Sequence, residues 1–271
     1  MISILVPARN EIYLNKTLED LVLKAEGEIE IIVNLDGYWQ IPLITDPHII
    51  YIHRGTPIGM RGGINSCVDI AKGEYLMKLD AHCMMDQGYD VKLIKDYEEN
   101  TVVVPRRYAL DPKKWQIEER KDDKYPIDFM YLDKTLHGIV WNEKNHDPVL
   151  KDKLIDETMS NQGSIWFMSK KYFHYLELMD ESLYGMFWNE FQEIGLKCWL
   201  SGGRVMVNKN TWYAHWHKNE GRGYSLPSQE QINAQKNIDR WLTEKMFSKQ
   251  IHKLKWLIDR FAPVPTWEKH V

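Results

Sequence analysis

The segment Leu79-Asp80-Ala81-His82 places a carboxylate and an imidazole two residues apart, directly after a short apolar run. In an extended chain, residues i and i+2 point to the same side, so both side chains can reach one ion. A mixed set of oxygen and nitrogen ligands suits Mn²⁺ or a similar divalent ion. The spacing makes Asp80 and His82 candidate metal ligands. Read alone, the tripeptide fits a capped turn followed by an ordinary loop histidine better, and it is the surrounding motifs described below that favour the metal site.

A second chemical element is the acidic start of a helix expected from Trp188 to Leu200. Asn189 and Gln192 form a plausible capping arrangement, which places Glu190 in the first turn. There the helix dipole favours the ionised carboxylate that a general base requires. The alternative is an ordinary helix-start carboxylate. Trp188 is a candidate for stacking on a sugar ring, and Glu193 can pair with Lys197.

These residues need elements that bring them together, and the N-terminal half supplies alternating strands and helices. Because such a pattern indicates a mainly parallel sheet, ligands are expected beyond the carboxyl ends of its strands, where Arg9, Asp36 and Asp80 fall. Strands are expected at 2–6, 30–35, 49–53 and 75–79. The first expected helix runs from about 14 to 25 and is closed by Gly27, and the second runs from about 61 to 71 and is capped by Gly73.

The second half is less regular. A strand at 102–105 is followed by a stretch, 106–159, that we expect to form irregular β structure and loops on the acceptor side. Strands are then expected at 163–168, 204–207 and 212–217. From about Ser228 the pattern is helical until Pro263 and Pro265. We therefore expect a catalytic domain at 1–225 and a helical extension packed on it at 226–271.

The composition excludes several classes of protein. The chain has 271 residues, a formal net charge of -4 and 44% hydrophobic residues, so it has no general basic field for nucleic acid. Its three cysteines are distant from one another and are expected to be reduced core thiols. Neither a signal segment nor an apolar run of membrane-spanning length is visible, and a cytoplasmic protein is the expectation.

Three motifs carry a resemblance to a known family. They are Val6-Pro7-Ala8-Arg9-Asn10-Glu11, the run from Gly59 to Asn65, and the run from Ala71 to Cys83 that contains Asp80 and His82. The sequence resembles the family-2-like glycosyltransferases of GT-A fold over roughly residues 1–217. Its Leu-Asp-Ala-His-Cys element is similar to the Asp-x-His segment of the polypeptide N-acetylgalactosaminyltransferases. The resemblance implies a Rossmann-like α/β fold, a nucleotide-sugar donor, most simply a UDP-sugar, and Mn²⁺ or Mg²⁺ as cofactor.

For the donor site, the resemblance implies that Pro7, Ala8, Arg9 and Glu11 border the nucleotide. Asp36 is then expected to contact the uracil or ribose, and Arg61 the pyrophosphate, a group that a guanidinium binds well. Glu11 and Arg61 could instead simply begin helices.

The third metal ligand implied by the resemblance is His215, chosen over His217, for which phosphate binding is the alternative role. The glycine-punctuated segment after these histidines is expected to be a mobile lid whose Lys218 and Arg222 face the donor phosphates, although a plain surface loop explains the same residues.

On the acceptor side the resemblance assigns the functional carboxylate to Glu190, next to Trp188 and Asn189. Inverting relatives usually carry aspartate at this position and often Asp-x-Asp at the metal, whereas the Asp-x-His type includes retaining enzymes. The sequence therefore leaves the stereochemistry open. Glu190 would act as base in an inverting enzyme and would orient the acceptor in a retaining one.

The function expected from the sequence is transfer of a hexose or N-acetylhexosamine from a UDP-sugar to an acceptor hydroxyl. A saccharide, a small metabolite, a protein or a hydroxymethylated DNA base could carry that hydroxyl. The DNA alternative rests on a basic, aromatic C-terminal stretch between Lys245 and Phe261, which also fits a solvated helix face. A nucleotidyltransferase and an inactive nucleotide-sugar binding module are the alternatives of other classes.

Overall fold

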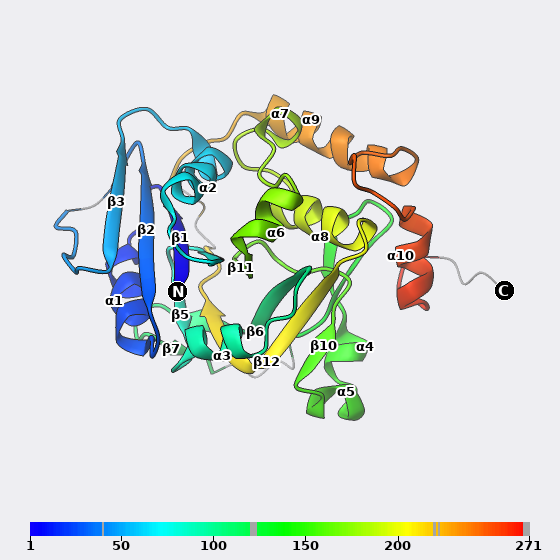
Figure 1. Ribbon diagram of the computed structural model, residues 1–271, viewed down its shortest axis with the longest axis horizontal. Helices are drawn as coiled ribbons and strands as arrows, with labels where there is room; N and C mark the ends of the chain where they lie inside the picture. Colours follow the sequence, from blue (N-terminus) through cyan, green and yellow to red (C-terminus); the bar gives the residue numbers. More distant parts are fainter. Residues whose placement is uncertain (40, 120–123, 219–220, 222, 268–271) are drawn as a thin grey trace.

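A computed structural model describes residues 1–39, 41–119, 124–218, 221 and 223–267 of the chain. Its centre is a ten-stranded sheet with the order β10-β12-β6-β11-β4-β1-β2-β3, to which β5 adds beside β12 and β7 beside β6. A separate pair, β8 and β9, lies outside this sheet. In Figure 1, β3, β2 and β1 lie on the left and β6 and β12 in the middle, so the sheet extends across the molecule.

The strands have the following bounds: β1 Ile2–Ala8, β2 Ile29–Asp36, β3 Ile49–Arg54, β4 Tyr75–Leu79, β5 Cys83–Met85, β6 Thr101–Asp111, β7 Gln116–Ile117, β8 Met130–Leu132, β9 Gly138–Val140, β10 Ile155–Glu157, β11 Ile165–Ser169 and β12 Arg204–His215. The helices are α1 Leu14–Lys24, α2 Gly59–Ile70, α3 Tyr89–Lys95, α4 Asn142–Asn145, α5 Pro148–Asp152, α6 Lys170–Tyr175, α7 Glu181–Tyr184, α8 Glu190–Leu200, α9 Ser228–Asp239 and α10 Leu254–Phe261, with a 3₁₀ turn at Arg240–Leu242.

The N-terminal half has the alternating architecture expected from the sequence. Strands β4, β1, β2 and β3 pair in parallel. Their carboxyl ends therefore meet at one edge, where Asp36 ends β2 and Asp80 follows β4. The helix ends differ slightly from those expected, because α1 and α2 are capped at Ala25 and Ala71. Gly27 and Gly73 thus lie beyond the caps.

Alternating side chains of β1 divide the core between the two faces of the sheet. Leu5 packs in the cluster that contains α2 and α8, whereas Ile4 and Val6 pack in the cluster that contains α1 and α3. This is the period-two pattern of a strand buried on both faces. The three cysteines are free and buried, as expected.

Two strands in the second half are longer than expected. Strand β6 runs from Thr101 to Asp111, where the sequence predicted a strand only at 102–105. The strands expected at 204–207 and 212–217 form one strand, β12, whose register shifts between Asn208 and Trp212. A bulge of this kind bends a strand without ending it, which explains why the hydrophobic alternation is interrupted there.

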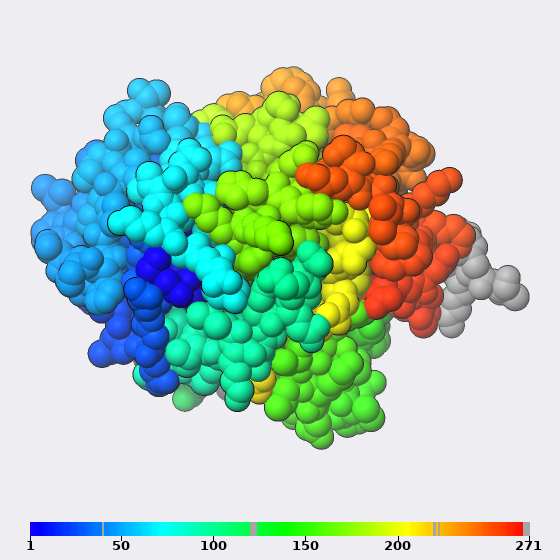
Figure 2. Space-filling model, in the orientation of Figure 1, coloured from blue at the N-terminus to red at the C-terminus, as the bar shows by residue number. Residues whose placement is uncertain are grey.

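The C-terminal helices share the main core. Ala234, Ile238 and Trp241, together with Leu257 and Phe261 of α10, are buried in the same cluster as α8. Figures 1 and 2 show these segments, in orange and red, packed directly against the yellow-green middle of the chain. A division into domains at residue 225 remains a prediction. No helix of the described residues is long and apolar enough to cross a membrane.

Candidate active site

Three side chains that could hold a metal ion meet at the end of β4. Strand β4 stops at Leu79, so Asp80 to His82 form a turn rather than the extended segment expected from the sequence. The next strand, β5, pairs antiparallel with β12, and His215 is the register partner of Cys83. This pairing brings the imidazole of His215 beside that of His82, although 133 residues separate them.

The ligand atoms of this triad converge closely enough for one ion. His82 Nε2 lies 3.2 Å from His215 Nε2, and Asp80 Oδ2 lies 3.3 Å from His215 Nε2 and 3.9 Å from His82 Nε2. Ligands bonded at about 2.1 Å to one ion are separated by roughly 3.0–3.5 Å at octahedral to tetrahedral angles. The two distances from His215 fall in this range, whereas the 3.9 Å between Asp80 and His82 exceeds it and would have to shorten around an ion. The mixed oxygen and nitrogen donors suit a divalent ion of the Mn²⁺ type.

Glu11 contacts both His82 and Lys218. Its Oε2 lies 3.0 Å from His82 Nδ1 and its Oε1 2.6 Å from Lys218 Nζ. Burial alone would raise the pKa of Glu11, but His82 and Lys218 lower it below its usual value. The carboxylate is therefore ionised, and it accepts hydrogen bonds without donating any. A hydrogen on Nδ1 of His82 would point to this carboxylate, which would leave Nε2 as the atom directed at a metal ion.

The ionisation states of the other two ligands also suit a cation. Burial would raise the pKa of Asp80, but the ammonium of Lys78 and the contact with His215 hold it well below its usual range. Burial lowers the pKa of His215 to about 3, so the ring is neutral at physiological pH. Burial and the nearby Arg107 lower the pKa of His217 to about 4. Its ring meets that of His215 edge to face at 4.6 Å.

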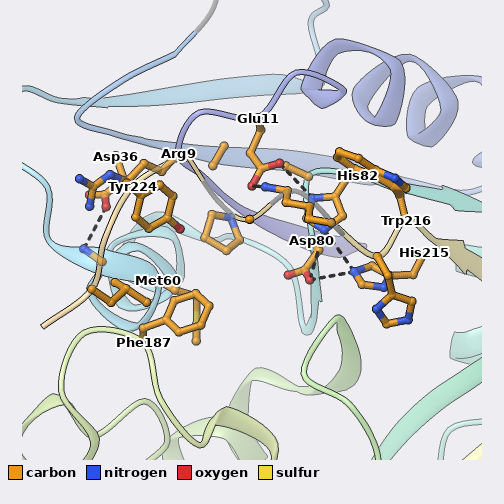
Figure 3. Close-up of a pocket in the computed structure, with 18 residues that line it drawn as sticks. Arg9, Glu11, Asp36, Met60, Asp80, His82, Phe187, His215, Trp216 and Tyr224 are labelled. Carbon is orange, nitrogen blue, oxygen red and sulfur yellow. Dashed lines mark hydrogen bonds and ion pairs between the residues drawn. The ribbon is translucent and has the colours of Figure 1, made fainter. Parts of the chain in front are cut away.

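A cavity of about 450 Å³ opens beside the triad and contains most of the predicted donor residues (Figure 3). Its size falls within the range of roughly 300–1,000 Å³ typical of small-molecule sites. In Figure 3, Glu11 lies on one side of this donor cavity and Met60 and Phe187 on the other. The residues expected at the donor that line it are Pro7, Ala8, Arg9, Glu11, Asp36, Asp80 and Lys218.

Asp36 lies in the cavity wall but already has backbone partners. Its carboxylate accepts hydrogen bonds from the N–H groups of Ile58 and Gly59, at 2.7 and 3.0 Å, where α2 begins. An acidic side chain is favourable at this positive end of a helix. Each carboxylate oxygen retains acceptor capacity, so contact with a ribose or base stays a prediction.

Arg61 does not reach the donor cavity. Its side chain is fully buried, its Nε and Nη2 donate to the carbonyl of Trp188, at 3.1 and 2.6 Å, and its Nη1 pairs with Glu193. Because α2 turns this residue toward α8 rather than toward the strand ends, the pyrophosphate contact implied by the sequence is wrong for this arrangement. Glu193 does pair with Lys197, at 2.7 Å, as expected.

Described residues of the segment after β12 line the donor cavity. They are Lys218, Gly221, Tyr224 and Leu226. The guanidinium of Arg9 lies 4.2 Å from the centre of the Tyr224 ring, within the range of a cation–π contact. These contacts join the segment to the loop after β1. Arg222, also expected there, lies outside the described residues.

Glu190 lines a second cavity, called here the acceptor cavity, together with Trp188 and Asn189. Asp80, His215 and His217 line both cavities, so the two meet at the triad. The expected cap is absent, because Asn189 has φ 55° and its side chain makes no cap hydrogen bond. Instead, Glu190 Oε1 accepts from Trp166 Nε1 at 2.8 Å. Burial raises the pKa of Glu190, and Lys78 opposes that rise.

Lys78 was not recognised from the sequence. Its buried Nζ lies 2.6 Å from Asp80 Oδ1 and 3.2 Å from Glu190 Oε2, so it connects a metal ligand with the candidate base. It also donates to the carbonyl of Gly163. A lysine inside the apolar strand Tyr75–Leu79 was the available signal, since a charged side chain rarely enters a buried strand without a partner.

Comparisons with known proteins agree with this arrangement. A family model described as glycosyl transferase family 2 matches residues 3–176. A crystal structure of GalNAc-T7 with UDP, GalNAc and Mn²⁺ is similar with a TM-score of 0.69 and 18% identity, covering 89% of this chain and 48% of that one. For S. aureus TarS 1–349 in complex with UDP-GlcNAc the TM-score is 0.51 and the identity 14%, with 83% and 61% covered.

The chain therefore spans about half the length of the first of these structures and less than two thirds of the second. At these identities the similarity establishes the fold, which is the GT-A arrangement that the sequence predicts. No curated protein matched the sequence.

Proposed function

Because the chain belongs to glycosyl transferase family 2, we propose that it transfers a sugar, a hexose or N-acetylhexosamine, from a UDP-sugar to an acceptor hydroxyl with the help of a divalent metal ion. One observation carries this proposal: the triad Asp80, His82 and His215 lies where the donor and acceptor cavities meet. A diphosphate in the first cavity and a hydroxyl in the second would thus be held on either side of the sugar.

The three ligands would hold Mn²⁺ most readily, and such an ion supplies Lewis acidity that neutralises charge on a departing diphosphate. Lys218 and Arg9 add positive charge to the donor cavity. Burial lowers the pKa of His215 to about 3, which keeps its ring neutral, and the contact with Glu11 orients the ring of His82. UDP and Mn²⁺ in the GalNAc-T7 structure and UDP-GlcNAc in the TarS structure support the choice of donor and ion.

Glu190 supplies the acceptor side. As a carboxylate it accepts the proton of an attacking hydroxyl if the configuration at the anomeric carbon inverts, and orients that hydroxyl if the configuration is retained. Lys78 and Trp166 hold the two oxygens of Glu190, which fixes the direction of its remaining lone pairs. The anomeric configuration of the first product, followed by NMR, distinguishes these two roles.

The test is a thermal-shift screen of UDP-, GDP-, CDP- and TDP-sugars with and without Mn²⁺. A ligand that binds only the native state at 100 times its Kd stabilises it by about 2.7 kcal/mol. We expect a shift with a UDP-sugar that requires Mn²⁺ and disappears in Asp80→Ala but not in the control Asp46→Ala, an aspartate in the loop before β3. No shift with any UDP-sugar contradicts the proposal.

Product analysis separates the alternatives. A glycosyltransferase releases UDP, a nucleotidyltransferase releases pyrophosphate, and an inactive binding module releases neither. We expect UDP.

A further inference from the structure

The acceptor cavity continues outward into a groove that no function described so far uses. This outer groove is formed by Trp188 and Gln192 near the start of α8, by Thr135 and His137 after β8, and by Gln231 and Gln235 of α9. His137, Trp188, Asn189 and Gln192 line the acceptor cavity as well. The two spaces are therefore adjacent, and a ligand whose reacting end lies at Glu190 would reach the outer groove and α9 by passing Trp188.

Side-chain amides dominate this path. The acceptor cavity is lined by Asn161, Gln162, Asn189 and Gln192, and the outer groove adds Gln231 and Gln235. Each amide offers two donors and an acceptor, which matches a hydroxyl group that both donates and accepts. Trp188, at the junction of the two spaces, contributes an apolar ring surface of the kind that stacks on a sugar face.

Most of these amides are available to a ligand. Within the described residues, the side chains of Gln162, Gln192 and Gln231 make no hydrogen bond, and the buried Nδ2 of Asn161 has no partner. Only Gln235 is engaged, through Asp239 at 2.8 Å and the carbonyl of Thr135 at 3.3 Å. Gln162 and Gln192 are partly exposed and Gln231 is exposed, so their amides are open to solvent or to a polar ligand in the two spaces.

The charge of the path disfavours a polyanion. No arginine lines either space among the described residues, and the one lysine, Lys78, is already paired with Asp80 and Glu190. Asp239 adds a carboxylate to the outer groove. Phosphate sites depend on arginine and lysine, so the lining of these two spaces favours an uncharged ligand over a phosphorylated one.

We propose that the acceptor is an uncharged saccharide of at least two sugar units, which places the reacting hydroxyl at Glu190 and the second unit in the outer groove between Trp188 and α9. The inference rests on the proposed function, which it extends by naming the acceptor class and the subsite that binds the second unit.

The experiment measures UDP release with Mn²⁺ and the UDP-sugar found in the thermal-shift screen. The acceptors are neutral monosaccharides (glucose, galactose, mannose, N-acetylglucosamine), neutral disaccharides (maltose, cellobiose, lactose, chitobiose), a serine- and threonine-containing peptide, and a DNA duplex with 5-hydroxymethylcytosine. We expect a neutral disaccharide to give a higher kcat/KM than its component monosaccharide.

Two glutamines of α9 provide a matched pair of variants. Gln231 lines the outer groove and Gln229 does not, and both are exposed, so neither change to alanine threatens the fold. Loss of one hydrogen bond of about 0.5–1.5 kcal/mol corresponds to about a 2- to 12-fold change. We expect Gln231→Ala to lower the ratio of disaccharide to monosaccharide kcat/KM by this factor, and Gln229→Ala to leave it unchanged.

Several results overturn the inference while the proposed function stands. In the first, water hydrolyses the donor and no neutral saccharide accepts the sugar. In the second, the sugar is transferred only to the peptide or the duplex. In the third, Gln231→Ala leaves the preference for the disaccharide unchanged. If no donor is bound or cleaved at all, the proposed function fails first and the acceptor assignment fails with it. Donor cleavage without acceptor, measured separately, distinguishes these two failures.

Discussion

At the scale of single residues, the candidate site is organised by charges that lie between functional groups. Lys78 contacts both Asp80 and Glu190, and Glu11 contacts both His82 and Lys218. Each connecting residue compensates a buried charge that would otherwise be costly. The ligands and the candidate base are thus held by neighbours that need not touch a substrate.

Gly163 allows Glu190 to occupy its position. A Cβ added there would come within 2.5 Å of Glu190 Oε2, the oxygen nearest Lys78. We expect Gly163→Ala to displace the carboxylate and weaken the contact that opposes the raised pKa of Glu190. If Glu190 acts as the proposed base, activity requires its ionised carboxylate, and in Gly163→Ala activity should be lost at a higher pH than in the wild type as the pH falls.

The pH dependence of kcat/KM checks this prediction. Gly55→Ala is the control, because a Cβ at Gly55 meets nothing within 4 Å. An unchanged acid limb in Gly163→Ala would show that the glycine does not set the state of Glu190.

Glu11 gives a second prediction at this scale. Glu11→Gln removes the negative charge that orients His82, and loss of such a supporting contact typically lowers metal affinity about 10- to 100-fold. Titration with Mn²⁺, followed by calorimetry, measures this affinity. Glu19→Gln, an exposed glutamate on α1, should bind Mn²⁺ as the wild type does. Equal Mn²⁺ affinities of the wild type, Glu11→Gln and Glu19→Gln would show that Glu11 does not support the metal site.

At the scale of elements, the arrangement of helices explains why one donor residue was assigned incorrectly. The motif at 59–65 was expected to direct Arg61 to a phosphate. Instead, α2 packs so that the guanidinium of Arg61 connects α2 to α8. The contacts with the carbonyl of Trp188 lie two residues before Glu190. Arg61 therefore holds the start of the helix that carries the candidate base.

We expect Arg61→Met to lower the free energy of unfolding by about 3–5 kcal/mol, because it leaves Glu193 buried with less compensation. Chemical denaturation measures this change. Arg240→Met, which breaks an exposed ion pair with Glu244, should have little effect. If Arg61→Met is as stable as the wild type but binds the donor more weakly, the prediction that Arg61 contacts the pyrophosphate would be supported instead.

Local signals predicted the parts of the site that lie close in sequence. Asp80 and His82 were proposed from their two-residue spacing together with the family motifs around them, and the resemblance assigned the functional position to Glu190 at the start of an expected helix. Lys78 was missed because its partner Glu190 is 112 residues away and its role exists only in the folded chain. The joining of two expected strands into β12 was missed because a bulge interrupts alternation. The choice of His215 as a candidate metal ligand required family resemblance, since spacing alone could not separate it from His217.

At the scale of the whole molecule, the C-terminal segment is part of the structure that surrounds the acceptor. Helix α10 buries Leu257 and Phe261 in the main cluster, against α8, and α9 forms one wall of the outer groove. The segment that the sequence indicated as an extension therefore contributes both to the core and to a proposed subsite.

We expect Leu257→Ala to destabilise the whole protein by about 2–5 kcal/mol, as for other fully buried leucines. A single cooperative transition at a lower Tm is the predicted result. Leu242→Ala is the control, since that side chain is 42% exposed. If instead α10 melts separately and the rest keeps its Tm, the C-terminal helices are an independent unit.

The position of Glu11 between His82 and Lys218 links two equilibria. An ion bound by His82 would polarise the imidazole that faces Glu11, and the same carboxylate faces Lys218. Thermodynamic reciprocity requires any effect of the ion on the contact between Glu11 and Lys218 to be matched by an equal effect of that contact on the affinity for the ion. The effect of Lys218→Met on Mn²⁺ affinity is thus a direct measure of the coupling between the proposed metal site and Lys218 in the wall of the donor cavity.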